Sequence, residues 1–114
     1  MSCPFCDEAD SVSIVSDFPS LFPVSEGHCL IIPSRHVTNW SDLTVLEEGG
    51  MWGRARSVMA RFDNADGFNL GVNLGEAAGQ TIEHIHIHVI PRRKGDCENP
   101  RGGVRHVIPG KGDY

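Results

Sequence analysis

Two segments of the chain alternate apolar with polar or small residues, and this period of two is typical of β-strands. Residues 82–90 (IEHIHIHVI) show it most clearly, and residues 68–73 (FNLGVN) show it after a turn signal at residues 64–67. Residues 28–32 are a short, largely apolar run between Gly27 and Pro33, as in a buried strand. We predict strands over these three ranges, with Pro91 ending the last, and weaker strand candidates at residues 13–16 and 21–24.

The segment between the predicted strands at residues 28–32 and 68–73 has a helical period instead. Thr44 and Glu47 fit a capping box, which places the start of a helix that runs over residues 44–62. Glycines in its middle each cost about 1 kcal/mol relative to alanine, so a kink or a break into two pieces is also consistent with the sequence. We predict Trp52 and Met59 as core residues on an apolar face formed by Val45, Trp52, Ala55, Met59 and Phe62.

Strands on both sides of one long helix predict an α+β domain, with the helix packed on a mainly antiparallel sheet. The 114 residues allow one domain, residues 1–114, and 39% apolar with 22% charged residues is a globular composition. No apolar run approaches the roughly 20 residues of a membrane helix, and residues 1–8 lack the features of a secretory signal. We expect a cytoplasmic protein without membrane contacts, whose four cysteines are thiols or metal ligands.

The charge is acidic overall but unevenly distributed. A net charge of −5 argues against a protein that binds nucleic-acid backbones. Residues 1–90 carry four basic and twelve acidic residues, whereas residues 91–114 carry six basic and three acidic ones. The basic tail, expected to be irregular over residues 92–114, is either a solvated surface segment or lies beside a site for an anionic small molecule.

Three histidines at a spacing of two stand out in the last predicted strand. His84, His86 and His88 would share one face of that strand, and the intervening apolar residues would take the other. The alternative is that the strand has an exposed polar face on which histidines occur by chance. Three histidines in strict alternation make this alternative improbable. Imidazole has an ordinary pKa of about 6.5, so this array suits either metal binding or covalent and acid–base catalysis on an anionic substrate.

Residues 73–81 form a glycine-containing loop immediately before these histidines. Its free backbone N–H groups, together with the side chains of Gln80 and Thr81, could hold a phosphate group. Such residues are common in loops between strands, so the composition alone is a weak signal. The position of this loop directly before the aligned histidines is what indicates a phosphate-binding site beside them.

These segments together resemble a known family. Residues 78–92 (AGQTIEHIHIHVIPR) look like the signature of the histidine triad (HIT) proteins, and residues 23–36 (PVSEGHCLIIPSRH) are similar to the family's upstream strand. The tail segment 99–105 (NPRGGVR) resembles the bacterial branch related to diadenosine polyphosphate hydrolases. The resemblance covers most of the chain and implies a HIT-like fold and a symmetric homodimer.

The resemblance implies a nucleotidyl hydrolase or transferase that forms a covalent intermediate. His86 would attack the α-phosphorus of a nucleoside phosphate derivative, of the diadenosine polyphosphate or phosphoramidate type, before water or another acceptor releases the nucleotide. His88 would contact the non-bridging phosphate oxygens, and His84 would orient His86. His28 matches an upstream histidine that packs near the triad.

The same resemblance implies roles for the preceding loop. The region of Gly79, with Gln80 and Thr81, would stabilise charge in the transition state. Asn73 would lie at the phosphate or ribose side of the pocket.

Cys3 and Cys6 form a CxxC pair near the N-terminus. Some HIT proteins and the related galactose-1-phosphate uridylyltransferases combine such a pair with two histidines that match His36 and His84. The resemblance thus implies a closed structural Zn²⁺ site that fixes residues 1–10 beside the histidine strand and takes no part in catalysis. Two free thiols and a redox motif are the alternatives. No role is assigned to Cys29, Cys97 or His106.

The chain departs from the family pattern in residues 13–22, where the family usually has two strands that supply an apolar wall for the base and an acid for the ribose. Only Asp17 is available as that acid, which leaves base specificity open. The alternative function is a zinc-stabilised nucleotide-binding or regulatory module with little turnover. A metalloenzyme with its metal on the triad itself would need a further ligand that the spacing does not supply.

Overall fold

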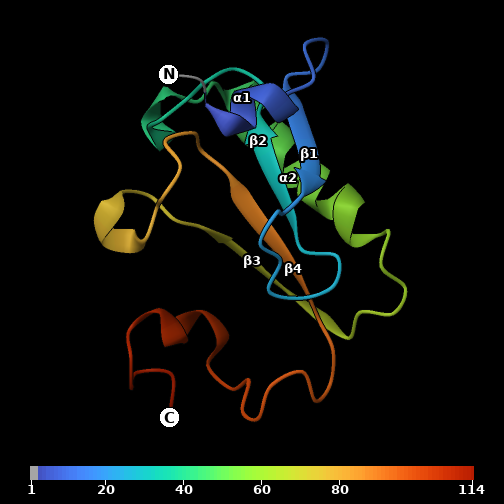
Figure 1. Ribbon diagram of the computed structural model, residues 1–114, viewed down its shortest axis with the longest axis vertical. Helices are drawn as coiled ribbons and strands as arrows, with labels where there is room; N and C mark the ends of the chain where they lie inside the picture. Colours follow the sequence, from blue (N-terminus) through green and yellow to red (C-terminus); the bar gives the residue numbers. More distant parts are fainter. Residues whose placement is uncertain (1–2) are drawn as a thin grey trace.

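The computed structural model describes residues 3–114, which fold into a four-stranded antiparallel sheet with one long helix (Figure 1). The spatial order of the strands places β2 (Cys29–Pro33), which follows His28, and β4 (Ile87–Arg92), which contains His88, in the middle of the sheet. The edge strands are β1 (Val15–Pro19) beside β2 and β3 (Gly67–Val72) beside β4. The predicted α+β fold is confirmed. The elements are α1 (Pro4–Glu8), β1 (Val15–Pro19), β2 (Cys29–Pro33), η1 (Trp40–Asp42), α2 (Val45–Met59), β3 (Gly67–Val72), η2 (Glu76–Ala78), β4 (Ile87–Arg92) and η3 (Gly103–Val107).

The strand predictions hold for β2 and β3 to within one residue, but β1 and β4 differ from expectation. β1 starts two residues later than predicted and continues to Pro19, and residues 21–24 form a loop instead of a strand. β4 starts only at Ile87 and runs through Pro91, which pairs with Phe68. Because β2 pairs with β4 only as far as Val89, the missing N–H of Pro91 interrupts no ladder on that side.

Helix α2 begins as predicted and is continuous. The Thr44 side chain accepts a hydrogen bond from the Glu47 N–H, and the Glu47 carboxylate accepts one from the Thr44 N–H, which confirms the capping box. The predicted core position of Trp52 is wrong, because this side chain is 41% exposed and lies near Trp40 at the edge of the fold. Val45, predicted on the same face, is also exposed. The prediction is correct for Ala55, which is buried, and the fully buried positions beside it are Met51 and Val58, each one residue before the predicted Trp52 and Met59.

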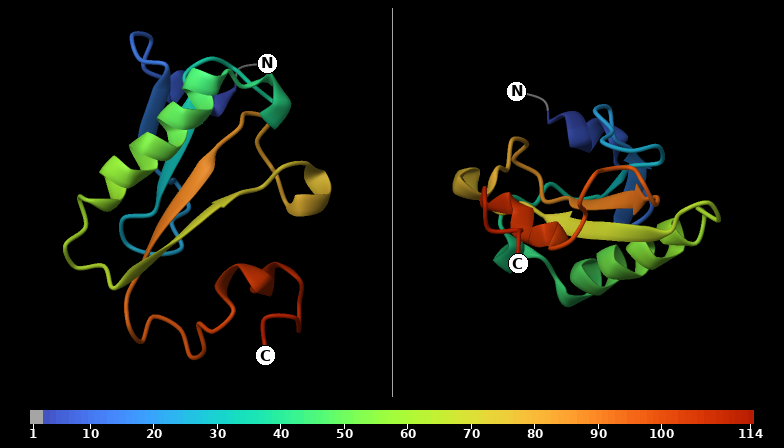
Figure 2. Two further views of the ribbon diagram at one scale, coloured as in Figure 1. Left: turned by 180° about the vertical axis from the view of Figure 1, so that it is seen from behind. Right: turned by 90° about the horizontal axis from the view of Figure 1, so that it is seen from below.

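The sheet has a different layer on each face. α2 packs on the face that carries Ile31, Ile87 and Val89, and partly buried Met59 joins this core. On the opposite face, Phe5 and Ala9 from the N-terminal segment pack on Phe18, Leu30 and Ile32. Seen edge-on, the sheet lies between α1 and α2 (Figure 2). Because the triad histidines alternate with residues of the α2-side core, their rings lie on the α1 side.

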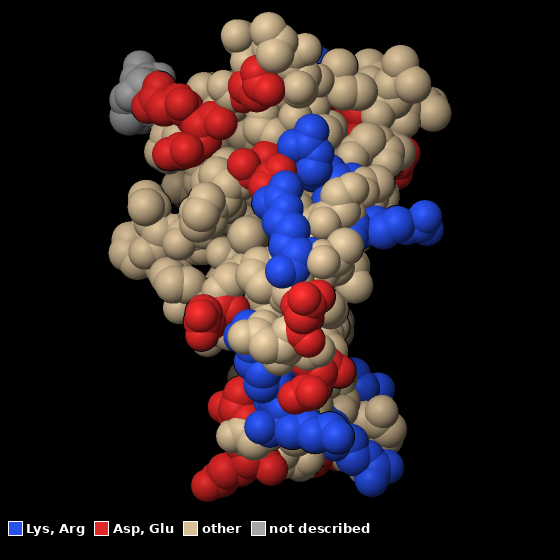
Figure 3. All heavy atoms as spheres, turned by 90° about the vertical axis from the view of Figure 1, so that its right-hand side faces the viewer, with Lys and Arg blue, Asp and Glu red and all other residues tan. Residues whose placement is uncertain are grey.

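Residues 93–114 contain no strand, and η3 is the helical turn in this tail. The tail passes beside β3, and the guanidinium groups of Arg101 and Arg105 both lie over the Tyr114 ring, 4.8 and 4.6 Å from its centroid. On the face shown in Figure 3, basic and acidic side chains are interspersed. Among residues 3–114, no helix is both long and apolar enough to cross a membrane.

The corrected face of α2 can be tested by truncating one residue on each side of the helix. We expect Met51→Ala to lower the free energy of unfolding by about 3 kcal/mol, because the side chain is fully buried in the core. Val45→Ala should change it by less than about 0.5 kcal/mol. Urea denaturation of both variants measures the two values. Equal losses would contradict the assigned face.

Candidate functional site

The position of the His86 proton is set by a backbone carbonyl. The ring is 5% exposed, and its Nδ1 lies 2.8 Å from the carbonyl oxygen of His84. A carbonyl oxygen only accepts hydrogen bonds, so Nδ1 must carry the proton, and Nε2 keeps a free lone pair. Burial lowers the pKa of His86, although the hydrogen bond to His84 acts in the other direction. The ring is therefore held neutral, with a lone pair on Nε2.

A second chain of hydrogen bonds orients His88. The N–H of Val24 donates to Nδ1 of His28, so neutral His28 carries its proton on Nε2. This Nε2 lies 2.9 Å from Nδ1 of His88, which therefore accepts and carries its own proton on Nε2. Burial, with the nearby rings of His86 and His28, lowers the pKa of His88 to about 4. His88 is thus a neutral N–H donor whose ring centroid lies 5.1 Å from that of His86.

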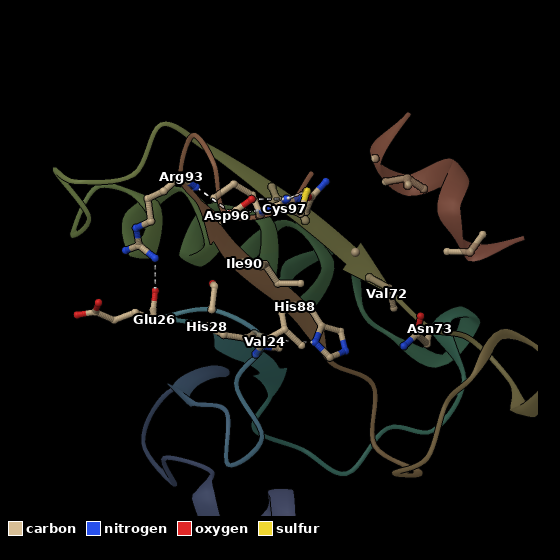
Figure 4. A pocket seen from close by; sticks show the side chains of 18 residues that line it. Val24, Glu26, His28, Val72, Asn73, His88, Ile90, Arg93, Asp96 and Cys97 are labelled. Atoms are coloured by element: carbon tan, nitrogen blue, oxygen red, sulfur yellow. Dashed lines mark hydrogen bonds and ion pairs between the residues drawn. The ribbon is translucent and has the colours of Figure 1, made fainter. Parts of the chain in front are cut away.

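His28, His88 and Asn73 line one cavity of about 890 Å³, between the outer half of the sheet and the C-terminal tail. In Figure 4, His88 projects from β4 toward the loop that carries Val24 and His28. The sequence-predicted residues at the third triad position, the upstream histidine and the phosphate or ribose side therefore lie together. The cavity wall also contains Val24, Ile90, Arg92, Arg93, Val104 and Val107.

The two arginines of this cavity are both engaged in hydrogen bonds. Arg92 donates two hydrogen bonds to Asp96 and a third to the side-chain oxygen of Asn69. The Asp96 pair raises the pKa of Arg92, and the Arg92 hydrogen bond lowers the pKa of Asp96. Arg93 donates to the carbonyl of Glu26. The charge of Arg92 is therefore balanced by Asp96, and hydrogen bonds hold both guanidinium groups in fixed positions.

The predicted phosphate loop, residues 73–81, borders two cavities, and Asn73 is its residue in the first one. Gln80 and Thr81 line a second cavity, of about 830 Å³, with Trp40. The Gln80 side chain accepts a hydrogen bond from the N–H of Gly75 and donates one to the carbonyl of Ile82, so it fixes the loop itself. Gly79 has a φ of 93°, a conformation that favours glycine. Gln80 and Thr81 thus line a different cavity from His28 and Asn73, and His86 lines neither of the two.

Asp17 lies on the α2 side of β1, among cations and away from the histidines. It accepts hydrogen bonds from Arg54 and Arg61. Although burial raises the pKa of the Asp17 carboxyl, these two arginines hold it below the usual value. Asp17 is thus engaged in a structural ion-pair cluster and lines neither of the two cavities near the histidines.

The four residues proposed to bind zinc come together around one point. One donor atom each from Cys3, Cys6, His36 and His84 lies within 4.8 Å of all the others. The sulfur-to-nitrogen distances are 3.2 Å for Cys6 to His36 and 3.5 Å for Cys3 to His84. A tetrahedral zinc with ordinary bond lengths separates sulfur and nitrogen by about 3.6 Å. Nε2 of His84 donates to the carbonyl of Pro33, which leaves Nδ1 free for a metal.

One residue of the site was missed by the sequence analysis. Phe5 packs edge-on against His86, with ring centroids 4.9 Å apart. It also packs against Phe18 and lies near His84. The signal for it was present, because Phe5 is the apolar residue between the two cysteines of the CxxC pair.

The chain is similar in sequence to a known protein family and to several of its curated members. Residues 8–95 match the family described as HIT domain. The chain is 45% identical over 83 residues to a bis(5'-adenosyl)-triphosphatase of Dictyostelium discoideum and 40% identical over 82 residues to an AP-4-A phosphorylase of Mycobacterium tuberculosis. These matches cover 70% and 68% of this chain, but only 56% and 42% of those relatives. The chain thus spans about half the length of these curated relatives.

A similar solved structure is that of a zinc-bound histidine triad family protein from Mycobacterium smegmatis. It is 33% identical and has a TM-score of 0.73, and the match covers 83% of this chain and 78% of that one.

The burial of His88 predicts an acid-sensitive fold. With a pKa of about 4 in the folded protein and about 6.5 in the unfolded chain, the unfolded chain binds more protons between these pH values. The free energy of unfolding should therefore decrease as the pH falls from about 6.5 to about 4, as measured by urea denaturation. His88→Gln should show a smaller decrease, whereas the exposed control His106→Gln should keep the full one. Identical pH dependence in both variants would contradict the assignment.

Proposed function

Because the chain belongs to the histidine triad family, we propose that it is a nucleotidyl hydrolase or transferase that acts through a covalent nucleotidyl-His86 intermediate. Its substrate would be a nucleoside phosphate derivative of the diadenosine polyphosphate or phosphoramidate type. One observation carries this proposal: His86 has an unprotonated Nε2, and the ring of His88, which carries an N–H donor, lies next to it.

The reaction follows from these two nitrogens. Nε2 of His86 attacks the α-phosphorus, so a P–N bond forms while the bond from phosphorus to the leaving group breaks. The leaving group departs with the electron pair of that bond and takes up a proton. Nε2–H of His88 donates to a non-bridging phosphate oxygen, which stabilises the charge that builds up in the transition state.

The second half of the reaction returns the enzyme to its starting state. Water attacks the phosphorus, the P–N bond breaks with its electron pair returning to Nε2 of His86, and the water loses a proton to solvent. Inorganic phosphate as the acceptor would give phosphorolysis instead. The names of the relatives, a triphosphatase and a phosphorylase, include both outcomes and support this substrate class.

Other predicted residues keep supporting roles in this proposal. Asn73 shares the cavity of His28 and His88 and would bind the phosphate or ribose. Gly79, Gln80 and Thr81 would stabilise transition-state charge from the loop side, with Gln80 fixing the loop by its two hydrogen bonds. His84 orients His86 through its backbone carbonyl.

We also propose that Cys3, Cys6, His36 and His84 hold a structural Zn²⁺ ion. Two sulfur and two nitrogen donors at these separations suit tetrahedral zinc, and the zinc-bound relative of M. smegmatis supports the assignment. The bound ion would supply a rigid crosslink and keep both thiols deprotonated. All four positions are filled by protein, so the site is structural.

A zinc-stabilised nucleotide-binding module with little turnover is the second candidate. One observation favours it: His86 is almost fully buried and lines neither of the two cavities beside the triad.

A homodimer, a cytoplasmic location and the absence of nucleic-acid partners stay predictions. The edge position of β3, with all six residues only half-buried, would suit pairing with a second copy.

The covalent step is tested by intact-mass analysis after brief mixing with diadenosine triphosphate or adenosine 5'-phosphoramidate. We expect an acid-labile adenylyl adduct in the wild-type protein and in the control His106→Ala. His86→Ala should form no adduct and lose at least about 10³-fold in turnover, because the nucleophile is absent. Bound nucleotide with neither adduct nor product would favour the binding module instead.

Zinc binding is tested by metal analysis of the purified protein. We expect one zinc per chain in the wild-type protein and in Cys97→Ser, whose thiol lies outside the cluster. Cys6→Ser should lose most of the zinc and show a lower Tm, because metal binding stabilises only the folded state. Full zinc content in Cys6→Ser would exclude this ligand set.

A further inference from the structure

Two groups that are close in sequence to the proposed zinc ligands contact the ring of His86, the proposed nucleophile. One is the carbonyl of His84, which accepts a hydrogen bond from Nδ1–H of His86. The other is the ring of Phe5, whose plane is inclined by 82° to the imidazole at a centroid distance of 4.9 Å. A single hydrogen bond at one ring nitrogen leaves the imidazole free to tilt. The phenyl ring removes part of that freedom by packing against it.

The position of Phe5 depends in turn on helix α1. This helix has five residues, no side-chain cap and no fully buried residue, so it is too short to be stable by itself. Phe5 lies between Cys3 and Cys6 in the sequence. The sulfur atoms of both cysteines lie close to Nδ1 of His84, at 3.5 and 3.6 Å. On its other side, Phe5 packs on Phe18, with centroids 5.3 Å apart. The cluster and the Phe18 contact together hold the phenyl ring.

We propose that Phe5 is a positioning residue for His86, and that it transmits the state of the Cys3–Cys6 metal cluster to the nucleophile. The inference rests on the proposed function only for its kinetic consequence. With the cluster occupied, α1 is fixed and Phe5 holds the imidazole so that Nε2 keeps one direction. When the cluster is empty, α1 loosens, Phe5 withdraws and the imidazole gains rotational freedom. The ion therefore affects the reaction without touching the substrate.

The direct test is nuclear magnetic resonance of histidine-labelled protein, since an edge-on phenyl ring shifts the ring signals of the imidazole beside it. We expect Phe5→Ala to move the His86 ring signals while those of His28 stay in place and the zinc content remains at one per chain. Phe22→Ala is the matched control, because that ring is 87% exposed in the loop between β1 and β2. It should leave the His86 signals unchanged.

Two routes from the metal to His86 are then separated by combining variant and chelator. In wild-type protein, removal of zinc should move the His86 signals. In Phe5→Ala it should move them much less, because the connecting ring is already absent. If chelation moves the His86 signals as far in Phe5→Ala as in the wild type, the effect travels through the His84 carbonyl, and the role of Phe5 is excluded. Unmoved signals in Phe5→Ala would exclude it as well.

The kinetic readout uses diadenosine triphosphate. We expect Phe5→Ala to lower kcat by about 10- to 100-fold, with KM changed less than about twofold, because an imprecisely held nucleophile slows chemistry more than binding. Phe5→Leu, which keeps much of the apolar volume, should recover part of the loss. A purely structural role would instead lower zinc content and Tm together. If the wild-type protein itself shows no turnover, the proposed function fails, but the resonance experiment still decides the role of Phe5.

Discussion

The site depends on hydrogen bonds between imidazole rings and the backbone. The carbonyls of Pro33 and His84 each accept a hydrogen bond from a ring N–H, and the N–H of Val24 donates to a ring nitrogen of His28. Because a carbonyl can only accept and an amide N–H can only donate, each contact fixes which nitrogen carries the proton. The antiparallel register of β2 and β4 maintains this arrangement, since the histidines lie in or beside the paired residues.

Much of this arrangement was predictable from the sequence, and the exceptions have physical reasons. The alternation of residues 84–89 predicts correctly that the three rings share one face, because side-chain direction in extended backbone depends only on position. It fails to predict that residues 82–86 lie outside the sheet ladder, where Ile85 bonds instead to the carbonyl of Val37. The face of α2 was predicted correctly at Ala55 but not at Trp52, because Met51 and Trp52 are adjacent apolar residues and Met51 is the one that fills the core.

Loop direction was beyond the sequence. Gln80 precedes the triad by a few residues, yet its side chain turns back to Gly75 and Ile82, and this residue lines a separate cavity. The donor cluster could be proposed from the resemblance, but the packing of Phe5 on His86 needed the three-dimensional arrangement. Local patterns define which residues are available, whereas tertiary contacts define which of them meet.

The donor cluster also has a consequence for the order of events during synthesis. Cys3 and Cys6 are synthesised before His84, the buried member of the set, which follows 81 residues after Cys3. Until that residue has left the ribosome, the nascent chain offers an ion at most three of the four donors, across loops whose closure is entropically unfavourable. A metal ion coordinated by all four groups is therefore acquired late, when the segment that carries the histidine array has emerged. Metal loading would then report that the histidine segment has reached its place in the fold.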